Sequence, residues 1–228
     1  MSKRLLLTLS IICALTASAQ KNKEYPVKAG EVPNAVLPGE AKYVLPAFKQ
    51  GTAMFKNKTS NSRLFNYNYL LNEMHFISDN GDTLAVAEPN LLDYVRIDSL
   101  YFYYDNGYVQ QIASRNEFKF AAKPEMVQVL DKKKGAYDIS SGTSSIDSYQ
   151  SVVTDNAQLY KLEVRKDVLF KKVASFYIGD KYNHFVKATK KNFNTVFGEQ
   201  KVSAYLKDHK VNFNMEDDLK GLFEYCTM

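Results

Sequence analysis

Metal chemistry in this 228-residue chain would depend on three histidines and two cysteines. His75, His184 and His209 lie far apart in sequence, and none has the short spacing to another histidine or to a cysteine that zinc sites usually show. The run from Asp79 to Asp82 lacks the later Gly and Glu that an EF-hand calcium loop requires. The sequence therefore predicts no metal site and no cofactor.

Nucleophilic chemistry has one cysteine to consider beyond the N-terminal segment, Cys226. It continues an i, i+3, i+4, i+7 stripe with Leu219, Leu222 and Phe223, so we expect a small core residue on a helix. A reactive thiol and an intermolecular disulfide are the alternatives. Since no Gly-x-Ser-x-Gly turn or glycine-rich phosphate loop occurs either, we assign no catalytic residue.

Glycosidase chemistry needs two carboxylates that flank a sugar. The carboxylates here are spread through expected turns, and Glu216, Asp217 and Asp218 fit the first turn of a helix, where the helix dipole favours negative charge. A secreted hydrolase acting on polysaccharide or peptide stays an alternative. It predicts a cleft with two acids, or with one acid beside His75 or His184.

Aromatic residues are the most unusual part of the composition, with 16 Tyr, 14 Phe and no Trp. In the run from Leu100 to Tyr104, strand alternation places Tyr101 and Tyr103 on one face and Phe102 on the other. Tyr101 and Tyr103 are therefore candidate binding residues, as a platform for a sugar ring or a protein partner. The alternative is a central strand that is covered on both faces.

Positive charge is concentrated in residues 161–210, which hold 12 basic and 5 acidic residues. Lys190 and Lys191 in this segment are candidate contacts for anionic lipid headgroups or acidic polysaccharide, which would allow peripheral membrane association. The alternative is a solvated helix face.

The first 19 residues have the pattern of a signal peptide for the Sec route. Lys3 and Arg4 precede an apolar run from Leu5 to Leu15, and Ala17-Ser18-Ala19 is a small-x-small cleavage site. Cleavage there leaves one cysteine and a net charge of +3, with no stretch long enough to span a membrane. We expect a protein of the periplasm, the outer-membrane periphery or the exterior, and no nucleic-acid partner.

The elements that would position these residues suggest three parts. Residues 20–46 hold four of the six prolines and predict an extended linker or a strap along the surface. Residues 51–188 show a period of two, with Asp-Asn-Gly turn signals at Asp79 and Asp105 and a polar loop over residues 132–158. Residues 189–228 change to a helical period, with Asn214 as the expected N-cap of the last helix.

The fold class expected is α+β: one domain over residues 47–228, mainly an antiparallel β-sheet built as a meander of short strands, followed by two or three C-terminal helices. The expected strands are 52–56, 63–67, 73–78, 83–87, 94–97, 100–105, 108–113, 117–121, 126–131, 159–164, 172–178 and 184–188.

Three segments carry a resemblance to uncharacterised secreted envelope proteins of Bacteroidetes-type bacteria. They are the run from Leu64 to Leu84, the Ser/Thr tract after Gly135-Ala136-Tyr137, and the C-terminal end from Glu216 to Cys226. The resemblance implies an exported envelope protein with no named activity. It also implies O-glycosylation at Asp-Ser/Thr followed by a small or aliphatic residue, which Thr83 and Ser99 match; ordinary entries from turn to strand are the alternative.

Taken together, these patterns favour a non-enzymatic binding or interaction module whose partner is an envelope protein or a glycan. The alternatives are the secreted hydrolase and a structural subunit of an outer-membrane-associated complex.

Overall fold

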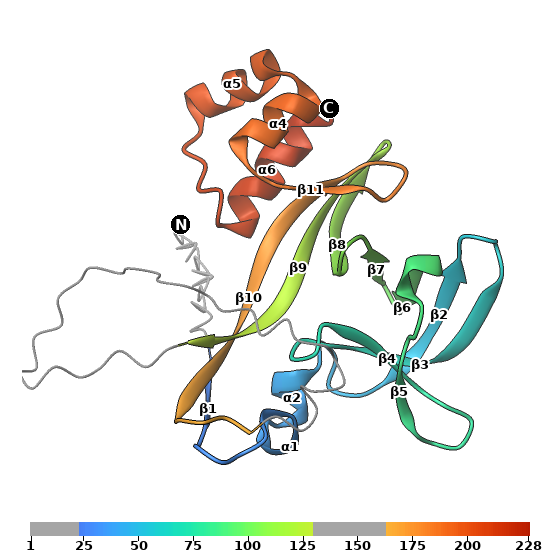
Figure 1. Cartoon of the computed structure of the whole chain (residues 1–228). Helices are drawn as coiled ribbons and strands as arrows, with labels where there is room; N and C mark the ends of the chain where they lie inside the picture. Colours follow the sequence, from blue (N-terminus) through green and yellow to red (C-terminus); the bar gives the residue numbers. More distant parts are fainter. Residues whose placement is uncertain (1–22, 130–162) are drawn as a thin grey trace, which may run out of the picture.

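A computed structural model of the chain describes residues 23–129 and 163–228 (Figure 1). Its centre is one antiparallel sheet with the strand order β1-β10-β9-β8-β7-β6-β2-β3-β4-β5, and β11 pairs with the far end of β10. The α+β class predicted from the sequence is confirmed. The strands are β1 Glu24–Val27, β2 Lys49–Phe55, β3 Ser60–Asn68, β4 Glu73–Ile77, β5 Thr83–Ala85, β6 Leu92–Ile97, β7 Leu100–Tyr104, β8 Tyr108–Arg115, β9 Phe118–Val129, β10 Val168–Gly179 and β11 Phe185–Lys187.

The two Asp-Asn-Gly signals both form hairpins, but with different loops. Between β7 and β8, the three residues from Asp105 to Gly107 join the paired Tyr104 and Tyr108, and both Asn106 and Gly107 have positive φ, which these residue types adopt at little cost. Between β4 and β5 only Gly81 has positive φ, and the loop is longer, with the Gly81 amide donating to the Ser78 carbonyl. Asn72 and Asn116 also take positive φ, at the turns that precede β4 and β9.

Strand β9 is one long strand, whereas the sequence predicted two, over residues 117–121 and 126–131. Pro124 suggested the break, because proline cannot donate to a ladder. Strand β8 pairs with β9 only as far as Ala122, so beyond it β9 has β10 on one side alone. The Pro124 carbonyl points to the side away from β10, where it accepts a hydrogen bond from Tyr67. Because no described strand lies on that side, the missing N–H of Pro124 breaks no ladder hydrogen bond.

The N-terminal part of the described chain differs from the extended linker expected over residues 20–46. Residues 24–27 form β1, which pairs with β10, and two short helices follow, α1 Pro33–Val36 and α2 Gly39–Lys42. Val27, Leu37 and Ala41 are buried against Met126 and Phe170. The prolines hid this because they start the helical turns and lie at the sheet edge, the places where a missing amide costs nothing.

Three helices gather at one end of the long strands β9 and β10 (Figure 1). They are α4 Lys190–Phe197, α5 Glu199–Asp208 and α6 Glu216–Cys226. The apolar stripes predicted from the sequence pack against Phe120 and Phe176 of the sheet. Helix α6 begins after Met215 rather than after the expected Asn214, and no side chain caps it.

Strands β2–β5 curl toward the rest of the sheet and enclose a second core. Tyr67 lies within it, stacked on Phe102, and its hydroxyl reaches the Pro124 carbonyl of β9 at 3.1 Å. The Met126 amide donates to the carbonyl of Tyr69. The end of β3 is therefore joined to the middle of β9, far away along the strand order, which closes one end of the curl.

Some expectations fall outside the described residues: the signal peptide over 1–19, the polar loop over 132–158 and most of the strand expected over 159–164. Residues 163 and 164 are not in a strand. Across the described ranges, no helix combines the length and the apolar character that crossing a membrane requires.

Candidate functional site

The curl of β2–β5 leaves an open cavity of about 370 Å³. Its floor is one face of the sheet, with Phe65 opposite Phe76 and Phe76 opposite Leu84 on neighbouring strands. The chain that leaves β5 passes through the short 3-10 helix η1 Pro89–Leu91 and forms the opposite wall. The lining residues are Ala53, Phe55, Asn61, Arg63, Phe65, Phe76, Leu84, Ala85, Val86, Ala87, Glu88 and Leu91.

Most of this lining is apolar, and two of its apolar side chains face solvent. Leu84 is 46% exposed and Leu91 is 52% exposed. Lone exposed leucines are common on proteins, but two beside an apolar cavity form a continuous surface for an apolar group. The charged lining residues are Arg63, which contacts Asp79 at 3.2 Å, and Glu88.

A buried polar cluster lies on the other side of the same strands. Nε2 of His75 is 2.9 Å from Oε2 of Glu73, and Nδ1 is 3.1 Å from the Tyr43 hydroxyl. Asn66 beside it makes two hydrogen bonds with the backbone of Leu45. The chain around residues 43–48 therefore covers these side chains, and His75 is 3% exposed.

Burial also affects the acid–base behaviour of Tyr43. Desolvation raises the pKa of the Tyr43 hydroxyl, a contact with the Asn68 side chain lowers it, and the Glu73 carboxylate raises it further. The net direction is upward, so the hydroxyl stays protonated at neutral pH. The Tyr43 hydroxyl and Glu73 thus contact the two ring nitrogens of His75, and the tautomer of the imidazole sets which atom donates in each contact.

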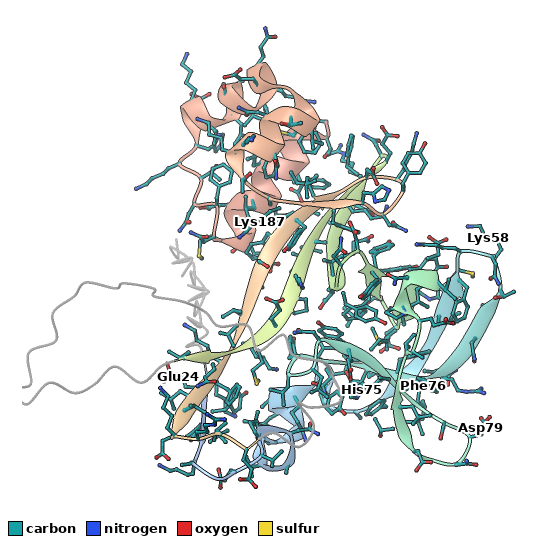
Figure 2. The ribbon with its side chains drawn as sticks, in the orientation of Figure 1. Glu24, Lys58, His75, Phe76, Asp79 and Lys187 are labelled. Carbon is teal, nitrogen blue, oxygen red and sulfur yellow. The ribbon has the colours of Figure 1, made fainter. Side chains whose placement is uncertain are left out.

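The cavity and the polar cluster are separated by the sheet itself. His75 and Phe76 are consecutive residues of β4, and alternation sends their side chains to opposite faces. Figure 2 marks both residues on this strand, with Asp79 at the tip of the hairpin beyond them. Phe76 lines the cavity, while His75 faces the covered cluster. An acid and a histidine do meet, but beneath the 43–48 segment and away from the cavity.

Of the two candidate tyrosines, the structure buries Tyr103 and leaves Tyr101 half-buried. The Tyr103 hydroxyl donates to Gln111, the Lys119 ammonium lies 5.2 Å from the ring centroid, and Phe185 of β11 packs on it. Desolvation raises the pKa of Tyr103 to about 12. Tyr101 packs against Tyr94 with ring centroids 5.5 Å apart.

Lys190 and Lys191 are exposed in the first turn of α4. The positive end of the helix dipole disfavours cations there, so these lysines do not stabilise the helix. They lie apart from the tyrosines: α4 packs on the sheet face of Phe120, whereas Tyr101 and Tyr103 belong to the other face. The structure thus does not join the four candidate residues into one site.

The remaining candidates have distinct surroundings. Thr83 at the start of β5 and Ser99 in the turn before β7 are exposed. Cys226 is a free thiol buried in the core under the helices, where burial raises its pKa. His184 and His209 are exposed, and neither lines the cavity. In the described ranges, no group of three His, Cys, Asp or Glu side chains could hold a metal ion.

Sequence reasoning missed the cavity because it depends on the curl of the sheet, which alternation does not encode. Sequence reasoning could, however, have found the polar cluster. Glu73 and His75 are two residues apart in a predicted strand, so they must share a face.

Comparison of the chain with protein-family models, with curated proteins and with solved structures finds no match.

Proposed function

We propose that the protein is an exported, non-enzymatic binding module of the bacterial cell envelope, which holds an apolar group of an envelope protein or glycan in the cavity of β2–β5. The observation that carries this proposal is an open apolar cavity of about 370 Å³, bordered by the exposed side chains of Leu84 and Leu91. Its volume lies in the range of ligand sites, about 300–1,000 Å³.

The arrangement of the acid–histidine pair favours binding over hydrolysis. A general base must lie within hydrogen-bond reach of the substrate. Glu73 and His75 are instead covered by Tyr43 and the chain that follows it, on the sheet face opposite the cavity. A substrate in the cavity would meet apolar side chains, Arg63 and Glu88, and not this pair.

The test is affinity capture of the tagged mature protein from its own cell envelope after mild cross-linking. Leu84→Glu places a charge in the cavity wall. Leu64→Glu is the matched control, because Leu64 is similarly exposed, at 41%, but stands one residue before Phe65 and so faces the other side of β3. We expect a stoichiometric partner that Leu84→Glu loses and Leu64→Glu keeps.

Two results would overturn the proposal. One is a partner that both variants retain, which would support a structural subunit that assembles through another surface. The other is hydrolysis of an envelope polysaccharide or peptide that disappears in His75→Gln, which would support the hydrolase.

A further inference from the structure

Strand β5 is the last strand at one end of the described sheet, and its outer edge carries backbone groups that pair with no described strand. The Val86 amide donates to Met74 and the Ser78 amide donates to Asp82, while Leu84 stands opposite Phe76. In an antiparallel ladder the residues bonded to the neighbour alternate with residues that point away. Thr83 and Ala85 therefore direct their amides and carbonyls to the outer edge, where no other strand of the described sheet lies.

The same strand forms a wall of the cavity. Leu84, Ala85, Val86 and Ala87 all line it, and the side chain of Leu84 is exposed. A strand added beside β5 would place every second side chain on the face of Leu84, next to the cavity. Hydrogen bonds to the edge would hold such a segment, and the cavity would select its apolar side chains.

Two carboxylates flank the edge. Asp82 precedes β5 and Glu88 follows it by three residues, and both are exposed. Neither carboxylate forms an ion pair or a hydrogen bond within the part of the chain that the structure describes. Asp79 differs, since Arg63 neutralises it. A segment lying along this edge would meet negative charge at each end.

These charges also favour one of two possible occupants of the β5 edge, which are a second copy of this chain and a segment of another protein. Antiparallel pairing of β5 with β5 of a second copy, centred on Ala85, would put Asp82 of each copy opposite Glu88 of the other. Like charges directly opposite on paired strands destabilise the pair. A segment with basic residues at its ends has complementary charge at the same positions.

We propose that the β5 edge binds an extended peptide segment of a partner protein, with apolar residues alternating along it and a basic residue near each end. This proposal rests on the proposed function, of which it names the partner class. The peptide pairs with Thr83 and Ala85, its apolar side chains enter the cavity beside Leu84 and Val86, and its basic residues lie near Asp82 and Glu88.

The experiment uses the mature protein and a capped peptide, Lys-Thr-Phe-Thr-Phe-Thr-Lys, with binding followed by fluorescence anisotropy. Replacing both lysines of the peptide by Glu should weaken binding about tenfold or more, the sum expected for two exposed ion pairs that become repulsive. Methylating the three threonine amides should abolish binding, because these amides face β5 while the side chains remain unchanged.

Two protein variants address the same contacts. Ala85→Pro removes an outward amide that β4 does not use, so the fold should survive, as melting and circular dichroism will check, while the affinity falls about tenfold. The double variant D82K/E88K should reverse the preference, so that the Glu-ended peptide binds more tightly than the Lys-ended one.

Uptake of the neutral dye Nile red separates the two proposals. If the protein takes up dye, Leu84→Glu loses it, and yet no peptide binds, the edge proposal fails and the cavity function stands. If neither dye nor peptide binds, the proposed function fails as well. A dimer in sedimentation that Ala85→Pro converts to monomer would show that a second copy occupies the edge and would overturn the peptide partner. Equal binding of both charge forms of the peptide would also overturn it.

Discussion

Tyr67 and Tyr108 pack against each other in the core of the curl, with ring centroids 5.8 Å apart, but their hydroxyls differ in hydrogen bonding. The Tyr67 hydroxyl lies 3.1 Å from the Pro124 carbonyl and 3.3 Å from Oδ1 of Asn72. The Tyr108 hydroxyl is buried and has no hydrogen-bond partner among the residues that the structure describes. Two adjacent tyrosines therefore differ in what a hydroxyl contributes to stability.

Removal of the two hydroxyls should have different effects on the free energy of unfolding. Tyr67→Phe should lower it by about 1–2 kcal/mol, because a buried hydrogen bond is lost and the Pro124 carbonyl is left unpaired. Tyr108→Phe should leave it unchanged or raise it by about 1 kcal/mol, because an unpaired buried hydroxyl is removed. Urea unfolding of both variants checks this, and equal losses in the two would contradict the assigned contacts.

The polar cluster should stabilise the curl. His75→Ala should lower the free energy of unfolding by about 3 kcal/mol, because it leaves a cavity and removes a buried partner of Glu73. Tyr43→Phe should cost about 1 kcal/mol, since only the hydrogen bond to Nδ1 is lost. Denaturant titration at pH 7 measures both. If the His75 variant were as stable as the native protein, the covering of this cluster by residues 43–48 would be in doubt.

Buried tyrosines should make the protein sensitive to alkali. The pKa of Tyr103 is raised to about 12 in the folded protein, above its ordinary value of 10.0. As pH rises from 10 to 12 the unfolded chain loses this proton first, so the folded state is progressively destabilised and the effect levels off above 12. Tyr103→Phe should flatten the fall in melting temperature over this window. An unchanged slope would mean that other tyrosines carry the effect.

The Cys226 thiol should react slowly in the native protein. It is 4% exposed, and burial raises its pKa, so little thiolate is present at pH 8. Ellman's reagent should therefore label it only in denaturant. Rapid labelling of the native protein would restore the alternative of a reactive or cross-linking cysteine.

Most of the sheet could be predicted from alternation, because successive side chains of a strand enter different layers on the two faces of the sheet. The run from Leu100 to Tyr104 shows what alternation can and cannot predict. The sequence assigned Tyr101 and Tyr103 to one face, and the structure agrees, since Phe102 lies in the core of the curl while Tyr103 belongs to the cluster with Val109 and Ala121. That β11 folds over this face, with Phe185 on Tyr103, was not predictable from local pattern.

The candidate site was less predictable, because it arises from contacts between residues far apart in sequence. The sequence around Leu84 is that of an ordinary strand, and the cavity beside it is lined by residues between Ala53 and Leu91 that only the curl of the sheet brings together. The N-terminal strand was hidden for a similar reason: Tyr25 and Val27 gain their burial from β10 and the two short helices, and nothing in four residues around a proline indicates such a partner.

The pairing of β1 with β10 has a consequence for how the molecule folds. Glu24 stands opposite Lys171, so the first described strand has no partner until nearly the whole sheet has been synthesised. Contacts between such distant positions form late and slow the folding rate. We expect β1 to join last, after the hairpins from β2 to β9 have assembled. If the chain were held unfolded until its synthesis was complete, the pairing of β1 with β10 would not be slowed, because that pairing needs the complete sheet.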